Sequence, residues 1–162
     1  MKRTPLSTLQ KNECRRGSAI LEFAIGASVM LSVFAGTFQF GYTFYQYNLL
    51  KNAVMNGASY ASTRNYDSTT NTPSNAFQTA VQNVVVYGDP SPANGSTPLA
   101  PGLSTSNVRV VPKLFSNATS NQPPISMTVS ISGYTISAVF GSTTLTNKPS
   151  VTYPYQGLWQ PY

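Results

Sequence analysis

The sequence contains no histidine, one cysteine and four carboxylate side chains in 162 residues. Without histidine or a second cysteine, it cannot form a Ser-His-Asp or Cys-His nucleophilic site, a histidine zinc site or an internal disulfide. Asp67 and Asp89 are the only carboxylates after residue 62, and they lie in two separate segments rich in Ser and Pro. That arrangement is a poor one for a glycosidase pair. We therefore expect a protein that is not an enzyme and that uses no cofactor or metal.

Charged residues are also scarce, at 9% of the chain against roughly 25% in soluble globular proteins. Half of the ten basic residues precede Gly17, and the others are scattered over the rest of the chain. Nucleic-acid binding needs a clustered basic footprint, so we expect no nucleic-acid partner. The basic head, which ends in Arg15 and Arg16, instead indicates an N-terminus that stays in the cytoplasm.

A long apolar segment follows the basic head. Residues 23–50 carry no charge and are rich in Ala, Leu, Val, Ile and Phe. As a helix, the apolar core at 23–41 would rise about 28 Å, close to the hydrocarbon thickness of a bilayer. Four aromatic residues lie at its C-terminal end and suit the outer membrane interface: Tyr42, Phe44, Tyr45 and Tyr47. We expect a single membrane span at about 23–45, in contact with the lipid bilayer.

The helix is expected to continue beyond the span, to cover 18–62. No proline occurs between Pro5 and Pro73, and residues 48–61 are good helix formers. Leu49, Ala53 and Met55, with Tyr60, give this extension a loosely amphipathic character.

The remaining segment, 63–162, is predicted to form a small exported α+β domain. Residues 74–87 have helical apolar spacing, with Ser74 as the N-cap and Gly88 at the end. Strands are expected at 107–115, 125–133 and 150–155, and 134–140 either extends the sheet or forms a short packing segment. In 125–133, the alternating residues Ile125, Met127, Val129 and Ile131 should share one face. The prediction is therefore a three- to four-stranded antiparallel sheet with one short helix.

Small residues recur every four positions along the apolar helix. The stripe consists of Ala24, Ser28, Ser32 and Gly36. Small side chains let a second helix approach closely inside a membrane, so this stripe is predicted to pack against other helices.

Glu22 is the only acid in the apolar helix, five residues after Gly17. A lone carboxylate in hydrocarbon costs on the order of 2–3 kcal/mol, so such a residue is a functional candidate. If the leader at 1–17 were removed after Gly17, Ser18 would carry a new ammonium group, and that group could neutralise Glu22 of its own or a neighbouring chain. Glu22 would then set the register between subunits.

Residues 15–24, Arg-Arg-Gly-Ser-Ala-Ile-Leu-Glu-Phe-Ala, resemble the start of type IV prepilin-like proteins, and more narrowly that of the TadE-like pseudopilins of tight-adherence pilus systems. Residues 40–45 (Phe-Gly-Tyr-Thr-Phe-Tyr), 52–53 (Asn-Ala) and 56–61 (Asn-Gly-Ala-Ser-Tyr-Ala) resemble later helical positions of that family. The resemblance implies cleavage between Gly17 and Ser18 by a prepilin peptidase.

The same resemblance implies a minor pilin or pseudopilin that helps to assemble a pilus for adhesion or secretion. Its partners would be other pilin or pseudopilin subunits and an inner-membrane assembly platform. The chain would reside in the bacterial inner membrane with a cytoplasmic N-terminus and a periplasmic C-terminal domain, and it could reach a cell-surface pilus after assembly. Two alternatives stay open: a major filament-forming pilin, and an uncleaved signal anchor that carries a periplasmic binding domain.

Overall fold

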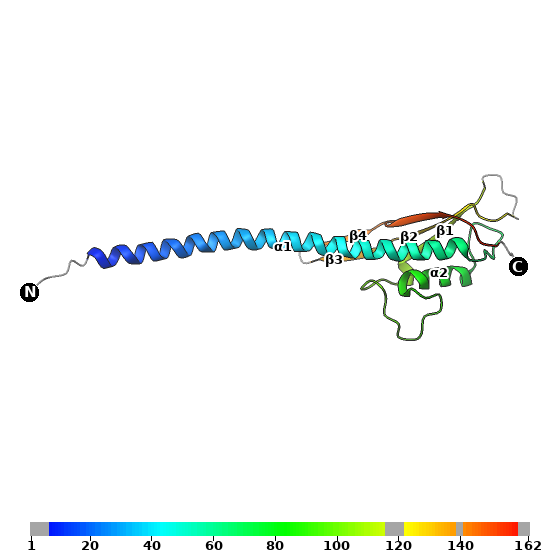
Figure 1. Cartoon of the computed structure of the whole chain (residues 1–162), viewed down its shortest axis with the longest axis horizontal. Helices are drawn as coiled ribbons and strands as arrows, with labels where there is room; N and C mark the ends of the chain where they lie inside the picture. The colour runs from blue at the N-terminus through cyan, green and yellow to red at the C-terminus, as the bar shows by residue number, and fades with distance from the viewer. Residues whose placement is uncertain (1–6, 116–121, 139–140, 159–162) are drawn as a thin grey trace, which may run out of the picture. The chain divides into compact units, whose positions relative to one another are not determined.

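The computed structural model describes residues 7–115, 122–138 and 141–158, with the backbone alone described for 7–16 and for 138. The chain divides into two compact units, Met1–Gly41 (unit 1) and Tyr42–Tyr162 (unit 2), and Figure 1 shows the whole chain. The first six residues of the predicted leader lie outside the described part.

Helix α1 runs from Ser7 to Thr63 without interruption. It contains no proline, and its glycines are isolated, so nothing in the sequence breaks the backbone hydrogen-bond ladder. The helix begins upstream of the expected position 18, because residues 7–17 have the same freedom from helix breakers as the segment that follows.

The C-terminus of α1 is capped by hydrogen bonds from the C-terminal part of the chain. The backbone N–H groups of Gln156 and Gly157 both donate to the carbonyl oxygen of Ser62, at 2.8 and 3.0 Å. The N–H of Tyr66 donates to the Leu158 carbonyl at 3.0 Å and to the Tyr155 hydroxyl at 2.8 Å. The bonds from Gln156 and Gly157 satisfy the Ser62 carbonyl, which the helix end leaves without an intrahelical partner.

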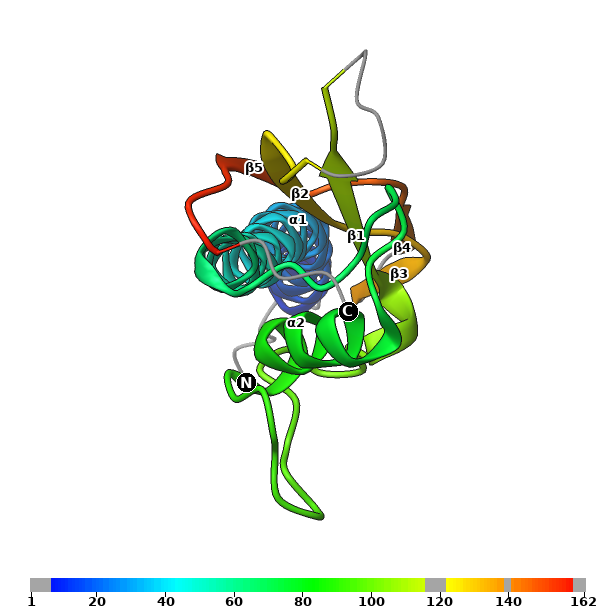
Figure 2. The same ribbon diagram turned by 90° about the vertical axis from the view of Figure 1, so that its right-hand side faces the viewer.

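The core of unit 2 is built on one stripe of α1. Its buried residues are Gln46, Leu50, Ala53, Val54, Gly57, Ala58, Ala61 and Ser62. In Figure 2, α2 lies on one side of this part of α1, and the sheet of β1, β2 and β5 lies on the other. The amphipathic set expected from the sequence was correct at Ala53 and wrong at Met55, which is exposed. The buried stripe is defined largely by alanine and glycine, whose low hydrophobicity hides it from a search for large apolar residues.

Helix α2, Asn75–Tyr87, confirms the predicted short helix and both of its ends. The Ser74 hydroxyl accepts the N–H of Phe77 at 3.1 Å, which caps the first turn. Gly88 adopts the left-handed conformation with φ 80°, and its N–H donates to the Val84 carbonyl at 2.9 Å. The apolar side of the helix faces the core with Phe77, Ala80, Val81, Val84, Val85 and Val86.

A three-stranded antiparallel sheet has the order β1-β2-β5. The strands are β1 (Val108–Lys113), which follows the 3-10 helix η1 (Thr105–Asn107), β2 (Ser126–Ile131) and β5 (Ser150–Pro154). Met127, Val129 and Ile131 point into the core as predicted. Ile125 precedes the strand and is 38% exposed, so the buried face begins at Met127 instead.

Strands β3 (Tyr134–Ala138) and β4 (Gly141–Leu145) form a separate two-stranded antiparallel sheet. The α+β class is thus confirmed, with sheets of three and two strands in place of one larger sheet. Strand β4 was missed because Gly141, Ser142, Thr143 and Thr144 are all exposed, which leaves no apolar alternation to detect. The described part of the 134–140 segment, strand β3, does not extend the main sheet but pairs with β4.

Candidate membrane and assembly site

The helical part of unit 1 presents apolar side chains on all sides. Phe23, Met30 and Phe34 are between 72% and 77% exposed, and the other large apolar residues from Ile20 to Phe40 are at least 59% exposed. The helical stretch Gly17–Thr63 is long and apolar enough to cross a membrane, and its most apolar window has no buried share. A helix that is apolar all round fits a lipid environment or contact with other helices.

Three hydroxyl side chains within this apolar stretch are satisfied by the helix itself. The hydroxyl of Ser28 donates to the Ala24 carbonyl at 2.6 Å, and that of Ser32 donates to the Ser28 carbonyl at 2.9 Å. Thr37 makes the same contact with the Val33 carbonyl at 2.9 Å. Because these hydroxyl groups already donate to the backbone, they can face hydrocarbon with little penalty.

The stripe of Ala24, Ser28, Ser32 and Gly36 is exposed along its whole length. A Cβ atom added at Gly36, or at the nearby Gly26, would meet nothing within 4 Å. The surface is thus open to a close approach by a second helix. Its use as a packing interface stays a prediction.

Glu22, Gly17 and Ser18 are all exposed on α1. Helical spacing places Ser18 and Glu22 one turn apart on the same face, so a charge at residue 18 would be a direct neighbour of the carboxylate. A Cβ atom added at Gly17 would meet nothing within 4 Å beyond the backbone of its own helix. The side chains of Arg15 and Arg16 lie outside the described part, although their backbone is helical.

The four aromatic residues expected at the membrane interface have different surroundings. Phe44 and Tyr45 are 59% and 63% exposed. Tyr42 is 39% exposed, and its hydroxyl accepts a hydrogen bond from Gln46 Nε2 at 2.7 Å. Tyr47 is half-buried against the core cluster of unit 2. Phe44 and Tyr45 are therefore the two whose rings are most free to enter an interface.

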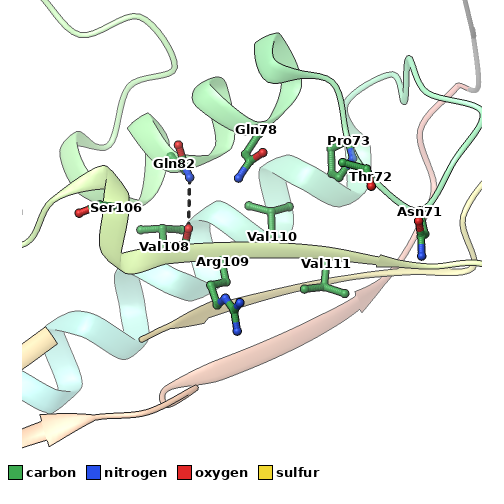
Figure 3. Close-up of a pocket in the computed structure, with 10 residues that line it drawn as sticks. All are labelled: Asn71, Thr72, Pro73, Gln78, Gln82, Ser106, Val108, Arg109, Val110 and Val111. Carbon is green, nitrogen blue, oxygen red and sulfur yellow. Dashed lines mark hydrogen bonds between the residues drawn. The ribbon is translucent and has the colours of Figure 1, made fainter. Parts of the chain in front are cut away.

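Unit 2 has an open groove of about 500 Å³ between α2 and β1 (Figure 3). Gln78 and Gln82 from α2 face the strand, and Gln82 Nε2 donates to the Val108 carbonyl at 3.2 Å. Asn71 and Thr72 come from the loop before α2. The lining holds amides, hydroxyls, three valines and Arg109 but no carboxylate or thiol, so it offers no nucleophile with a base. The sequence could not reveal this groove, because its lining comes from segments that meet only in the fold.

No group of three or more Cys, Asp or Glu side chains that could hold a metal ion occurs within the described ranges. Of the two carboxylates in unit 2, Asp67 accepts a hydrogen bond from the Ser74 hydroxyl, and Asp89 accepts one from the Ser91 N–H at 2.8 Å. Both therefore support local loop structure.

No curated protein and no solved structure gives a significant match to the chain. A family model does match part of α1, from the glycine at the end of the basic head to a point just before the end of the helix. The matched part includes Glu22 and the small-residue stripe, and it excludes α2 and all five strands. The resemblance inferred from the sequence is therefore confirmed for α1: residues 17–59 match the TadE-like protein family.

Proposed function

We propose that this chain is a minor pilin or pseudopilin of a tight-adherence, type IV-like pilus. A prepilin peptidase removes the leader after Gly17, and the mature helix then enters a bundle of subunit helices. The observation that carries this proposal is the family match that begins at Gly17 and includes Glu22, the one acid of the exposed apolar helix.

The residue at the cleavage point supports processing. Glycine weakens a helix interior by about 1 kcal/mol relative to alanine, which favours the local unwinding that a protease needs. Gly17 is exposed, and a Cβ atom added to it would meet nothing within 4 Å apart from its chain neighbours and the backbone of its own helix. Removal of the leader also takes away half of the basic residues, so that a nearly uncharged helix remains.

After cleavage, Glu22 has a defined task. The new ammonium group at Ser18 of one subunit pairs with Glu22 of the same or the next subunit, which offsets the penalty of a carboxylate in an apolar bundle. The small-residue stripe lets the helices approach closely enough for this pairing. The chain is held before assembly in the inner membrane by α1, with a cytoplasmic N-terminus and with unit 2 in the periplasm.

Assembly can be tested with Glu22→Gln, which keeps the size of the side chain and removes its charge. We expect the variant to be processed but lost from sheared pilus fractions, as measured by quantitative immunoblotting of membranes and filaments. Thr37→Val is the control, because it changes a polar side chain of the same helix without changing charge. Normal recovery of Glu22→Gln in filaments would contradict the registration role.

The same filaments separate the two pilin hypotheses. A minor subunit is present in small amounts relative to the main filament protein, as measured by mass spectrometry of purified pili. If this chain were the dominant protein, it would be the major pilin instead.

A further inference from the structure

The three-stranded sheet has an outer face, opposite α1 and α2, whose β1 and β5 positions are exposed. Burial alternates along β1: Val108 and Val110 are buried, whereas Arg109, Val111 and Lys113 are exposed. Figure 3 shows Arg109 and Val111 on the side of β1 away from α2. The outer face is the surface formed by these exposed β1 residues and their cross-strand neighbours in β2 and β5.

This face is rich in hydroxyl groups and carries positive charge. The register places Arg109, Ser130 and Ser150 in one row across the three strands, in which Ser130 is buried and Ser150 is exposed, and it places Lys113 beside Ser126. Between these rows, the hydroxyls of Thr128 and Thr152 are 2.8 Å apart. Lys148, also exposed, lies two residues before Ser150, beyond the Arg109 end of the face.

The edges of the sheet are poorly suited to strand addition, so the face is the more accessible docking surface. In β1, the N–H and C=O groups of alternate residues point away from β2, as the bond from Gln82 to the Val108 carbonyl shows. That alternation places Pro112 at an outward position of β1, and the bonds to β2 place Pro154 at an outward position of β5. Proline has no N–H to donate to an added strand, which blunts both edges.

The chain itself offers little negative charge to complement this face. The whole sequence has four acids, of which Glu13 lies in the basic head and Glu22 in the apolar helix. Asp67 and Asp89 are engaged with Ser74 and Ser91. Unit 2 of a second copy therefore offers two acids in separate loops and no acidic cluster.

We propose that the outer face of the β1-β2-β5 sheet binds an acidic polysaccharide. The cations pair with carboxylate or sulfate groups, and the exposed hydroxyls of Ser150 and Thr152 exchange hydrogen bonds with sugar hydroxyls. Arg109 and Lys113 are four residues apart on one strand, about 13 Å, which is too far to grip a single small anion and suits a polymer. This proposal is independent of the pilus role.

Other macromolecules fit the face less well. Protein interfaces are enriched in aromatic residues, Met and Arg and depleted in Ser and Lys, and Arg109 is the one residue of an enriched type on this face. Single-stranded nucleic acid is held by aromatic stacking platforms, and the outer face has none. Binding to anionic lipid usually needs clusters of four to eight basic residues.

The test uses the full chain in a non-ionic detergent at low salt, with alginate as the acidic polysaccharide and dextran as its neutral counterpart. The variant Arg109→Gln/Lys113→Gln removes two charges from the face. Lys51→Gln/Arg64→Gln removes two exposed charges from α1 and the residue just after it, and so serves as the matched control. Isothermal titration calorimetry measures the affinity, and circular dichroism checks that each variant is folded.

We expect binding to alginate but not to dextran, with about tenfold weaker binding for the sheet variant and little change for the control. Equal losses in the two double variants would overturn the proposal, because they would reflect net charge alone. The proposal is also wrong if the chain fails to bind alginate, or if it prefers duplex DNA or phosphatidylglycerol vesicles to alginate.

Discussion

Gly57 differs from the other glycines of α1 in what surrounds it. An added methyl group would overlap Cγ2 of Val85 in α2, whereas at Gly17, Gly26, Gly36 and Gly41 it would meet nothing within 4 Å. Valine in a helix has one strongly preferred rotamer, so Val85 cannot simply turn aside. Gly57 therefore lets α1 and α2 pack closely, and it also lies within the family match.

At the residue scale, Gly57→Ala should destabilise unit 2 by about 1–3 kcal/mol, because the two helices must separate to admit the methyl group. Urea unfolding followed by tyrosine fluorescence measures the change. Gly41→Ala is the control, and it should be neutral or slightly stabilising, because alanine is the better helix former where space is free. A Gly57→Ala variant as stable as wild type would contradict the close contact.

Tyr66 makes stability sensitive to alkaline pH. Its ring packs edge-on against Phe77 with 5.6 Å between centroids, and its hydroxyl donates to the Thr70 carbonyl at 2.6 Å. Burial raises the pKa of Tyr66 above its ordinary value of 10.0, and burial likewise raises the pKa values of Tyr134 and Tyr155. In the unfolded chain these phenols ionise at lower pH than in the folded one.

The direction in which stability changes with pH follows from which state loses its proton first. Below about pH 10 the phenol is neutral in both states, and above it the unfolded state loses its proton first, so stability falls as pH rises. Melting temperatures measured from pH 8 to 11 should decline beyond pH 10, and Tyr66→Phe should make the decline shallower. Tyr45→Phe, at an exposed ring, is the control and should leave the slope unchanged.

At the scale of single elements, Ser74 links two structures. Its hydroxyl caps α2 by accepting the Phe77 N–H, and it also donates to Oδ2 of Asp67, whose Oδ1 is buried without a hydrogen-bond partner. The carboxylate is thereby held near the N-terminus of α2, where the helix dipole favours negative charge.

Ser74→Ala should lower the free energy of unfolding by about 1–2 kcal/mol, through loss of the cap and of the one hydrogen bond to Asp67. Thermal unfolding monitored by circular dichroism measures the effect. Ser142→Ala, at an exposed position of β4, removes a similar hydroxyl and should have little effect. Similar losses in the two variants would contradict a special role for Ser74.

The elements also show which features the sequence can reveal. Helix α2 was predictable because Ser74, the apolar spacing and Gly88 are local signals, and β2 was predictable from the alternation of Met127, Val129 and Ile131. Strand β4 carries no such signal, since its side chains are exposed. Closure of α1 by Gln156 and Gly157 depends on backbone contacts between residues far apart in the sequence, which no local pattern records.

The same distinction applies to the candidate site. The sequence alone predicts roles for Gly17, Glu22 and the small-residue stripe, because those roles depend on spacing along one helix. The outer face of the sheet and the groove beside α2 depend on strand register and on the meeting of distant segments. Among the interface aromatics, only the fold shows that Tyr47 packs against the core while Phe44 and Tyr45 remain exposed.

At the scale of the whole molecule, the proposed function depends on cleavage of the chain after Gly17. Before processing, α1 is continuous from Ser7 through Gly17, and the basic residues of the head remain joined to the apolar helix. The proposed processing would make Ser18 the first residue and would give Glu22 a partner. The same sequence thus supports a membrane-held precursor and a subunit ready for assembly.

The N-terminal mass of the chain recovered from the cell envelope tests this account most directly. The chain should be expressed with and without an active prepilin peptidase, and Gly17→Val should be compared with Gly26→Val, since both glycines are exposed on the same helix. The account predicts a mature chain that begins at Ser18 only when the peptidase is active, with processing blocked in Gly17→Val and retained in Gly26→Val. An envelope protein that keeps residues 1–17 in the presence of active peptidase would contradict it and would favour the uncleaved anchor.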